Sequence, residues 1–240
     1  MNRISTLVLC CGLLWLTSCK ATQEETGQEA KTGKTEVNEV KKIEETQVEQ
    51  SEKSLESIKK LTPPTLDDVG SPDELAVIST EYGEIVLKFY PDVAPMHVAN
   101  FKKLARAGFY DGTKFHRVIP GFVIQGGDPN SLDDDPYNDG TGGPGWCIEA
   151  EFNQIKHDKG ILSMARSRDP NSAGSQFFIC LSREKTRNLD NQYTVFGETV
   201  KGIEVVEKIG SIARDPQKNA KDPAVEMKSV KIVKPSEVGL

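Results

Sequence analysis

Residues 115–128 read Phe-His-Arg-Val-Ile-Pro-Gly-Phe-Val-Ile-Gln-Gly-Gly-Asp, two short apolar runs on either side of Pro-Gly. β-Branched and aromatic residues bounded by turn residues are typical of strands, so the stretch predicts two short strands. Alternation along the first strand places Arg117 on the same face as Phe115 and Ile119. Gln125 lies within the second apolar run. A cation and an amide are therefore expected among large apolar side chains.

Similar short strand patterns continue on both sides. Helical spacing predicts one helix that opens at Pro95 and ends before Gly108, and a second over residues 203–209. Many short strands with Gly-rich turns and two helices indicate a mainly β barrel or sandwich with a single core. The predicted strands are residues 75–80, 84–90, 113–119, 122–126, 160–165, 176–181, 193–196 and 227–233.

The polar residues of these strands suggest a site. Arg117, Gln125 and Gln176 each share a strand with aromatic or β-branched residues, and no carboxylate or nucleophile of obvious use accompanies them. One interpretation is a surface that binds a ligand through a cation, two amides and aromatic rings. The other is structural: the guanidinium of Arg117 reaches solvent past its apolar stem, and the glutamines cap strand edges.

Four blocks in order carry a resemblance to a known family. Residues 115–128 resemble the central signature of the cyclophilin-type peptidyl-prolyl isomerases. Residues 160–165 (Gly-Ile-Leu-Ser-Met-Ala), 171–179 (Asn-Ser-Ala-Gly-Ser-Gln-Phe-Phe-Ile) and 194–197 (Thr-Val-Phe-Gly) resemble further family blocks. The resemblance covers about residues 75–233. It implies a closed eight-stranded antiparallel β-barrel capped by two helices, with the site on the outer surface.

The resemblance also implies the site residues, carried over position by position. The implied catalytic residues are Arg117 and Gln125. Asn188 stands where many family members carry Trp, and a Tyr stands where the site His is usual. No cofactor or metal is implied. The implied substrate-binding residues are Phe122, Val123, Ala165, Arg166, Gln176, Phe178, Leu189 and Tyr193.

The chemistry of these residue types agrees with isomerisation of Xaa-Pro bonds. Rotation of such a bond breaks no covalent bond, but amide resonance imposes a barrier of about 18–20 kcal/mol. The expected activity is therefore that of a peptidyl-prolyl cis-trans isomerase with proline-containing polypeptides as clients. The alternative is a non-catalytic module or chaperone that holds proline-containing segments in the cell envelope.

The N-terminus predicts export and lipidation. Arg3 precedes an apolar run over residues 4–16, which has the length of a secretory signal and is short for a transmembrane helix. Residues 16–19, Leu-Thr-Ser-Cys, resemble the lipobox of bacterial lipoproteins, so residues 1–18 are expected to be a signal peptide and Cys19 to be acylated. The alternatives are an ordinary cleaved signal with a chance Cys, or an uncleaved anchor. The lipoprotein interpretation predicts an extracytoplasmic protein anchored to a bacterial membrane.

The segment that follows has the composition of a spacer. No aromatic residue lies between Trp15 and Tyr82, and eight lysines against twelve acidic residues give residues 20–71 a net charge of −4. Such a segment buries too little apolar surface to offset chain entropy. Residues 19–71 are therefore predicted to be a flexible tether, with a transient helix or a weak partner site as the alternative. Residues 72–240 are predicted to form the isomerase domain.

Other functions are disfavoured by composition and spacing. The net charge of −6 argues against nucleic-acid binding. Residues 135–146 superficially resemble a calcium loop, but Trp146 occupies the position that needs a bidentate Glu. His97, His116 and His157 lack metal-ligand spacing. Cys147 and Cys180 either pair in an oxidising envelope or leave Cys180 free and buried. We expect a monomer.

Overall fold

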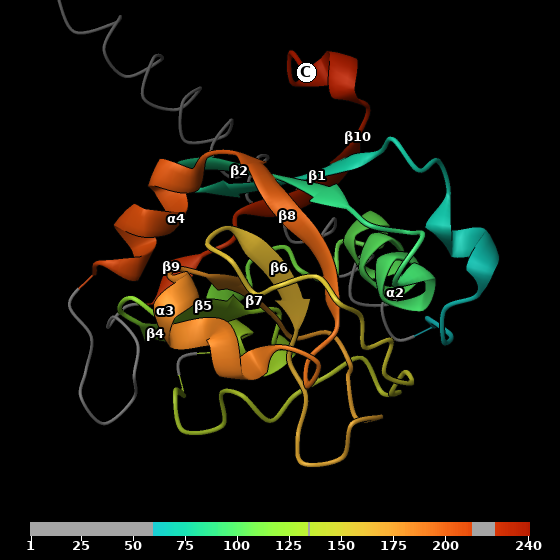
Figure 1. Ribbon diagram of the computed structural model, residues 1–240, viewed down its shortest axis with the longest axis horizontal. Coiled ribbons are helices and arrows are strands. Elements are labelled where there is room, and N and C mark those ends of the chain that lie inside the picture. Colours follow the sequence, from blue (N-terminus) through green and yellow to red (C-terminus); the bar gives the residue numbers. More distant parts are fainter. Residues whose placement is uncertain (1–59, 134, 213–223) are drawn as a thin grey trace, which may run out of the picture. The chain divides into compact units, whose positions relative to one another are not determined.

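The computed structural model describes residues 60–133, 135–212 and 224–240 (Figure 1). The predicted signal peptide, Cys19 and the predicted tether up to residue 59 lie outside these residues. Within the described ranges, no helix combines the length and apolar character needed to cross a membrane.

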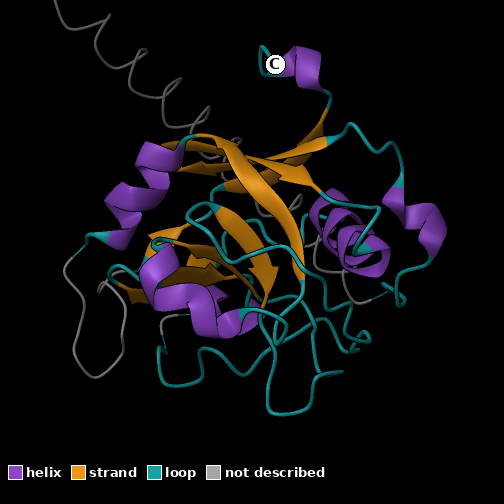
Figure 2. Ribbon diagram, in the orientation of Figure 1, coloured by secondary structure: helices purple, strands orange, loops and turns teal. Residues whose placement is uncertain are grey.

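An eight-stranded antiparallel sheet forms the framework of the domain (Figure 2). Its strand order is β10-β1-β2-β8-β6-β7-β5-β4, so β10 and β4 are edges that do not pair with each other. The sheet is curled but open, and the predicted closed barrel is not confirmed. The strands are β1 (Leu75–Thr80), β2 (Gly83–Phe89), β4 (Arg117–Ile119), β5 (Val123–Gly126), β6 (Ile161–Met164), β7 (Phe177–Cys180), β8 (Val195–Lys201) and β10 (Ser229–Val233).

A separate pair of two-residue strands lies beside the two edges. β3 (Lys114–Phe115) pairs with β9 (Val225–Glu226), and these strands come just before β4 and β10 in the sequence. The edges of the large sheet therefore approach each other at this one place. The hydrogen bonding between β3 and β9 does not continue between β4 and β10, so the sheet stays open.

The interruption at His116 changes which way its neighbours face. The predicted strand 113–119 is divided into β3 and β4 at this residue. Phe115 is fully buried in the main core, whereas Arg117 pairs in register with Gln125 on the opposite face. The prediction that Phe115 and Arg117 share a face is therefore wrong, because strict alternation assumes an unbroken strand.

Two helices pack on the sheet, as predicted. α2 (Pro95–Arg106) begins with Pro95 in its first turn, and the Glu151 carboxylate accepts hydrogen bonds from the backbone N–H groups of Met96 (3.0 Å) and His97 (2.9 Å). α4 (Ile203–Gly210) contacts β2 as well as β4 and β5, strands far apart in the sheet order, and only a curled sheet allows this. The shorter helices are α3 (Arg183–Thr186), η1 (Leu66–Val69), η2 (Pro129–Leu132), η3 (Arg187–Leu189) and η4 (Pro235–Glu237).

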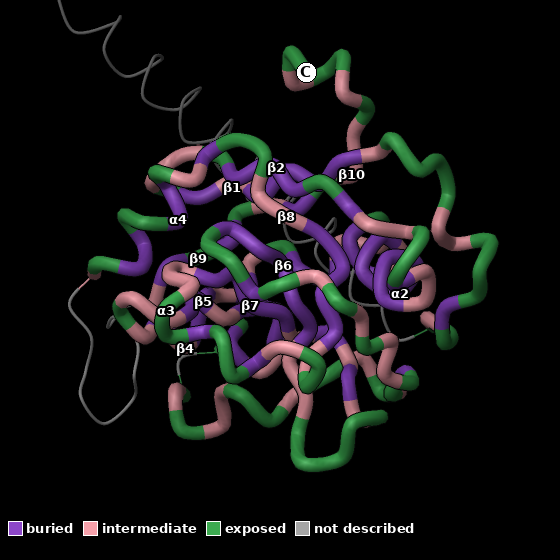
Figure 3. Tube along the Cα trace, viewed as in Figure 1, coloured by how far each residue is buried: buried purple, intermediate pink, exposed green. Residues whose placement is uncertain are grey.

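The main core lies between the inner face of the sheet and the helices. Phe101 from α2 is at its centre, with ring centroids 4.9 Å from Tyr110, 5.3 Å from Phe177 and 5.8 Å from Phe196. Figure 3 shows most strand residues and part of α2 buried, whereas the connecting loops are largely intermediate or exposed. A second, smaller apolar cluster lies on the outer face of the sheet and is described with the site.

The described end of the predicted tether packs on α2. The Lys102 side chain is fully buried, and its Nζ donates to the carbonyl oxygens of Val69 (2.8 Å) and Ser71 (2.7 Å) and to the Glu74 carboxylate (3.0 Å). Lys103 forms an ion pair of 3.2 Å with Asp68. The packed part of the chain therefore begins before Pro72, the predicted domain boundary.

The contacts of Lys102 with Val69, Ser71 and Glu74 clamp residues 69–74 to α2, and this clamp predicts a stability effect. Lys102→Met removes the donor to two backbone carbonyls and leaves Glu74 with one basic partner fewer, so we expect a loss of about 1–3 kcal/mol in the free energy of unfolding. Denaturant unfolding measures the loss, and limited proteolysis should show faster cleavage within residues 60–74. Lys231→Met, at an exposed lysine, is the control. Equal unfolding free energies for the two variants would contradict the assignment.

Candidate active site

Strand register brings a row of side chains together on the outer face of the sheet. Arg117 pairs with Gln125, Gln125 with Phe178, Phe178 with Ser163, and Ser163 with Val195. Successive strands lie about 4.8 Å apart, so these five residues form one continuous band across β4, β5, β7, β6 and β8. The band places a cation and an amide beside an aromatic ring.

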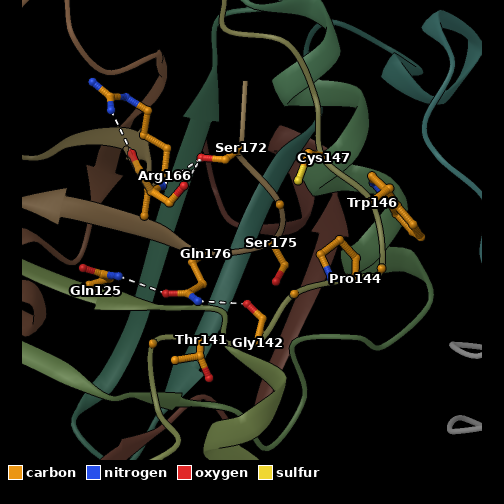
Figure 4. Close-up of a pocket in the computed structure, with 16 residues that line it drawn as sticks. Gln125, Thr141, Gly142, Pro144, Trp146, Cys147, Arg166, Ser172, Ser175 and Gln176 are labelled. Carbon is orange, nitrogen blue, oxygen red and sulfur yellow. Dashed lines mark hydrogen bonds between the residues drawn. The ribbon is translucent and has the colours of Figure 1, made fainter. Parts of the chain in front are cut away.

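A chain of amides holds the cation at the end of this band. Arg117 Nη1 donates to Gln125 Oε1 (3.1 Å), and Gln125 Nε2 donates to Gln176 Oε1 (3.0 Å). Gln176 Nε2 in turn donates to the carbonyl oxygen of Gly142 (2.9 Å), as Figure 4 shows. Three of the predicted site residues are therefore connected, and the guanidinium is oriented by a neutral acceptor.

Arg117 is a partly desolvated cation. It is half-buried, and none of the described carboxylates forms an ion pair with it. Burial lowers the pKa of Arg117, while Tyr193 acts in the opposite direction. An arginine pKa starts so high that the guanidinium stays protonated at neutral pH. Its remaining N–H groups are thus available to a ligand on the outer face.

The apolar side of the site is a compact cluster next to the band. Phe178 is 4% exposed and Leu189 8%, and the Tyr193 ring meets Phe178 edge-on with centroids 5.7 Å apart. Val123 belongs to the same cluster, and Phe122, Ala165 and Tyr193 pack against it. The structure thereby brings together the predicted apolar site residues, which form an outer-face surface lined by rings.

Arg166 covers one side of this surface. Its guanidinium carbon lies 4.6 Å from the centroid of the Tyr193 ring, and its Nε donates to the carbonyl oxygen of Gln192 (2.9 Å). The neighbouring Ala165 N–H donates to the carbonyl oxygen of Gln176 (2.9 Å). Arg166 therefore stabilises the position of Tyr193 through a cation–π contact.

A pocket of about 480 Å³ adjoins the amide chain (Figure 4). Gln125, Gln176 and Ala165 line one side, and residues 140–147 line the other. The fully buried Asp128 fixes this loop, because its carboxylate accepts from the N–H groups of Asn130 (2.8 Å) and Gly142 (3.2 Å). A Cβ at Gly142 would lie 2.2 Å from Asp128 Oδ1, so glycine is required there.

The comparison with known proteins settles the family. The family model "Cyclophilin type peptidyl-prolyl cis-trans isomerase/CLD" matches residues 75–232. The chain belongs to the cyclophilin family. Its enzymatic activity is accordingly that of a peptidyl-prolyl cis-trans isomerase, and the predicted family is confirmed.

Individual relatives agree with this assignment. A peptidyl-prolyl cis-trans isomerase of Synechococcus elongatus is 50% identical over 124 residues, 52% of this chain and 79% of the relative. Isomerase B of Bacillus subtilis is 46% identical over 130 residues, 53% of this chain and 84% of the relative. A Cryptosporidium parvum cyclophilin crystallised in the presence of the dipeptide Ala-Pro has a TM-score of 0.60 and 32% identity, covering 67% of this chain and 99% of that one.

Sequence reasoning missed the residues that support this surface from below. His157 is fully buried, stacks on Phe178 with centroids 6.0 Å apart and lies 3.0 Å from the Ser163 hydroxyl. Asp128, which fixes the loop beside Gln176, was also not singled out. A signal existed for Ser163, a polar residue in an otherwise apolar strand. The partners of His157 and Asp128 are distant in sequence or set by turn geometry, so no local pattern reveals them.

The two cysteines of the domain are free. Cys147 is exposed and lines the pocket, whereas Cys180 is fully buried in the outer-face cluster, where burial raises the pKa of its thiol to about 12. This agrees with the second of the two sequence-based alternatives. In the described ranges, no three or more His, Cys, Asp or Glu side chains form a metal-binding group.

The cysteine environments predict selective alkylation. Thiolate is the reactive form, so at pH 8 we expect iodoacetamide to modify Cys147 in the native protein and to leave Cys180 unmodified. Peptide mass spectrometry measures both positions, and denaturation before alkylation is the control that exposes Cys180. Modification of Cys180 at a similar rate in the native protein would contradict the burial described here.

Proposed function

We propose that this cyclophilin isomerises Xaa-Pro bonds in exported polypeptides and assists their folding, from a lipid anchor on a bacterial membrane. The half-buried Arg117, oriented by Gln125 beside an apolar ring-lined surface, is the observation that carries the catalytic part of the proposal. The apolar run and the Leu-Thr-Ser-Cys sequence at the N-terminus support the location. The protein is proposed to act as a monomer.

The catalytic role of Arg117 follows from the electronic change during rotation. In the planar ground states the prolyl nitrogen shares its lone pair with the carbonyl group. As the C–N bond twists, the nitrogen becomes pyramidal and regains that lone pair. A guanidinium N–H directed at this nitrogen stabilises the twisted state more than either planar state, which is the requirement for catalysis.

The apolar cluster supplies the complementary binding surface. Phe122, Val123, Phe178 and Leu189 form a slot for the pyrrolidine ring, with Tyr193 as a further wall. Gln176 and the backbone around Arg166 hold the chain on one side of the bond while the other side rotates. Gln125 keeps the guanidinium in place. Rotation about the C–N bond breaks no covalent bond and transfers neither a proton nor an electron, so the scheme uses no cofactor.

The proposal predicts the effect of removing the guanidinium. Arg117→Ala should lower kcat/KM about 30- to 900-fold, which corresponds to a loss of about 2–4 kcal/mol of transition-state stabilisation, as for removal of an oxyanion donor. A chymotrypsin-coupled assay with a Xaa-Pro-Phe peptide measures it. Arg117→Lys keeps the charge without the planar fork and should recover only part of the rate.

The same assay separates the proposed mechanism from its rival. Unchanged kcat/KM in Arg117→Ala would exclude the catalytic role of the guanidinium. A wild-type protein that binds the peptide without accelerating isomerisation would instead indicate a non-catalytic module that holds proline-containing segments. The proposal is supported if the wild type accelerates isomerisation and Arg117→Ala loses most of kcat/KM while circular dichroism shows that its fold is intact.

The anchoring part of the proposal has its own test. Cys19→Ser removes the residue that resembles an acylation site, so we expect the protein to leave the membrane fraction and to lose labelling by a radioactive fatty acid. A bacterial expression host and phase separation in a nonionic detergent measure both. Ser18→Ala is the control, because it replaces one small residue by another directly before Cys19. Continued labelling of Cys19→Ser would contradict lipidation at this position.

A further inference from the structure

The loop between β7 and β8 presents two walls of the proposed proline slot. Leu189 ends η3, and the backbone N–H of Tyr193 donates to the carbonyl oxygen of Leu189 (3.2 Å), which joins the two walls directly. Asp190 lies between them in the sequence, and its side chain is only 12% exposed. A carboxylate buried this far needs strong partners, and those partners determine where the two walls sit.

Arg183 is the main partner of this carboxylate. Its Nη1 donates to Asp190 Oδ1 (2.9 Å) and its Nη2 to Asp190 Oδ2 (2.7 Å), the paired geometry that a planar guanidinium provides. The hydrogen bonds from Arg183 hold the pKa of Asp190 well below its usual range, although burial acts in the opposite direction. Arg183 also contacts Asp158 (3.3 Å). Asp190 is therefore ionised, and the two parallel hydrogen bonds from Arg183 (the fork) fix its position.

Asp190 in turn fixes a buried histidine. Its Oδ1 accepts from the backbone N–H of His157 (3.0 Å) and lies 3.2 Å from His157 Nδ1. Burial lowers the pKa of His157, with the hydrogen bond to Asp190 opposing this, so the imidazole is neutral at pH 7. A carboxylate at Nδ1 selects the tautomer with hydrogen on that nitrogen, and Nε2 is left as an acceptor.

The other side of the imidazole provides a weaker constraint. Ser163 has one hydroxyl proton and two acceptors within reach, His157 Nε2 at 3.0 Å and the carbonyl oxygen of Thr194 at 2.9 Å. One proton cannot satisfy both acceptors at once. The Asp190 carboxylate is therefore the contact that decides the orientation of the ring.

The orientation of His157 reaches the slot through Phe178. The two rings are nearly parallel, with an interplanar angle of 17° and centroids 6.0 Å apart, and Phe178 meets Tyr193 on another side. Phe178 is also the register partner of Ser163 and of Gln125. A tilt of the His157 ring therefore displaces the ring that lies between the apolar slot and the amide that holds Arg117.

We propose that Arg183 and Asp190 are positioning residues for isomerisation, acting through His157 on Phe178 and through the backbone on Leu189 and Tyr193. Neither residue belongs to the apolar cluster that forms the slot in the proposed function, on which this inference rests. Their effect is to hold the slot at a fixed distance from Arg117. Without the paired hydrogen bonds between Arg183 and Asp190, this distance varies more. The isomerisation rate of the bound peptide therefore falls more than the affinity for the peptide.

Kinetics of the full-length protein test this linkage between the Arg183–Asp190 pair and the slot. We expect Arg183→Ala to lower kcat about tenfold and to change KM less than about twofold, as for loss of a supporting contact behind a reacting group. Arg183→Lys keeps the charge but not the fork and should recover part of the loss. Arg187→Ala is the matched control, because this exposed arginine lies on the next turn and Asp190 has no contact with its side chain in the described residues. A kcat of Arg183→Ala within twofold of this control would overturn the proposal.

Two further measurements separate positioning from simple loss of stability. Long-range ¹H–¹⁵N spectra of the His157 imidazole should show the Nδ1–H tautomer in the wild type and a tautomer mixture in Asp190→Asn. The double variant Arg183→Ala/Asp190→Asn should lose little more than either single variant, because the residues act in one chain. Additive losses, or a kcat that recovers fully after correction for the unfolded fraction, would contradict the linkage.

These outcomes are distinguishable from failure of the proposed function. A wild-type protein without isomerase activity would refute the proposed catalytic mechanism, whereas an active wild type with an unchanged imidazole spectrum in Asp190→Asn would refute only the linkage. The spectrum does not depend on peptide turnover.

Discussion

The interruption of the strand at His116 is the constraint on which the site depends. It allows Phe115 to enter the main core while Arg117, two residues later, lies on the outer face in register with Gln125. Without it, alternation would put the cation and a buried aromatic ring on one side of the sheet. The break thus separates a face that stabilises the fold from a face that presents a cation to a ligand.

The curled sheet is apolar on both sides, but the two sides have different roles. The inner face packs around Phe101, whose ring contacts Tyr110, Phe177 and Phe196 of the same buried cluster. The outer cluster around Phe178 is smaller and is bordered by Arg117, Gln176 and Arg166. Phe178 stacks on the buried His157, so the outer face is supported by hydrogen bonds beneath this ring as well as by apolar packing.

Local sequence patterns predicted most strands, both long helices and, through the family resemblance, the residues around Arg117 and Phe178. They could not predict that the edge strands β4 and β10 do not pair with each other, because the pairing of distant edges is decided by the whole sheet. The break at His116 was missed because periodicity assumes a regular strand. The contacts of Arg183 with Asp190, of His157 with Ser163 and of Lys102 with Val69 were missed because each depends on loops or on residues distant in sequence.

The clamp between α2 and residues 69–74 also has a mechanical consequence. β1 lies between β2 and β10 and starts at Leu75, directly after the residues that Lys102 and Arg106 hold. A pulling force applied from the N-terminal side therefore reaches the last turns of α2 before it reaches the sheet. The hydrogen bonds of Lys102 and the ion pairs of Glu74 must therefore break before the load reaches the hydrogen bonds between β1 and its neighbouring strands.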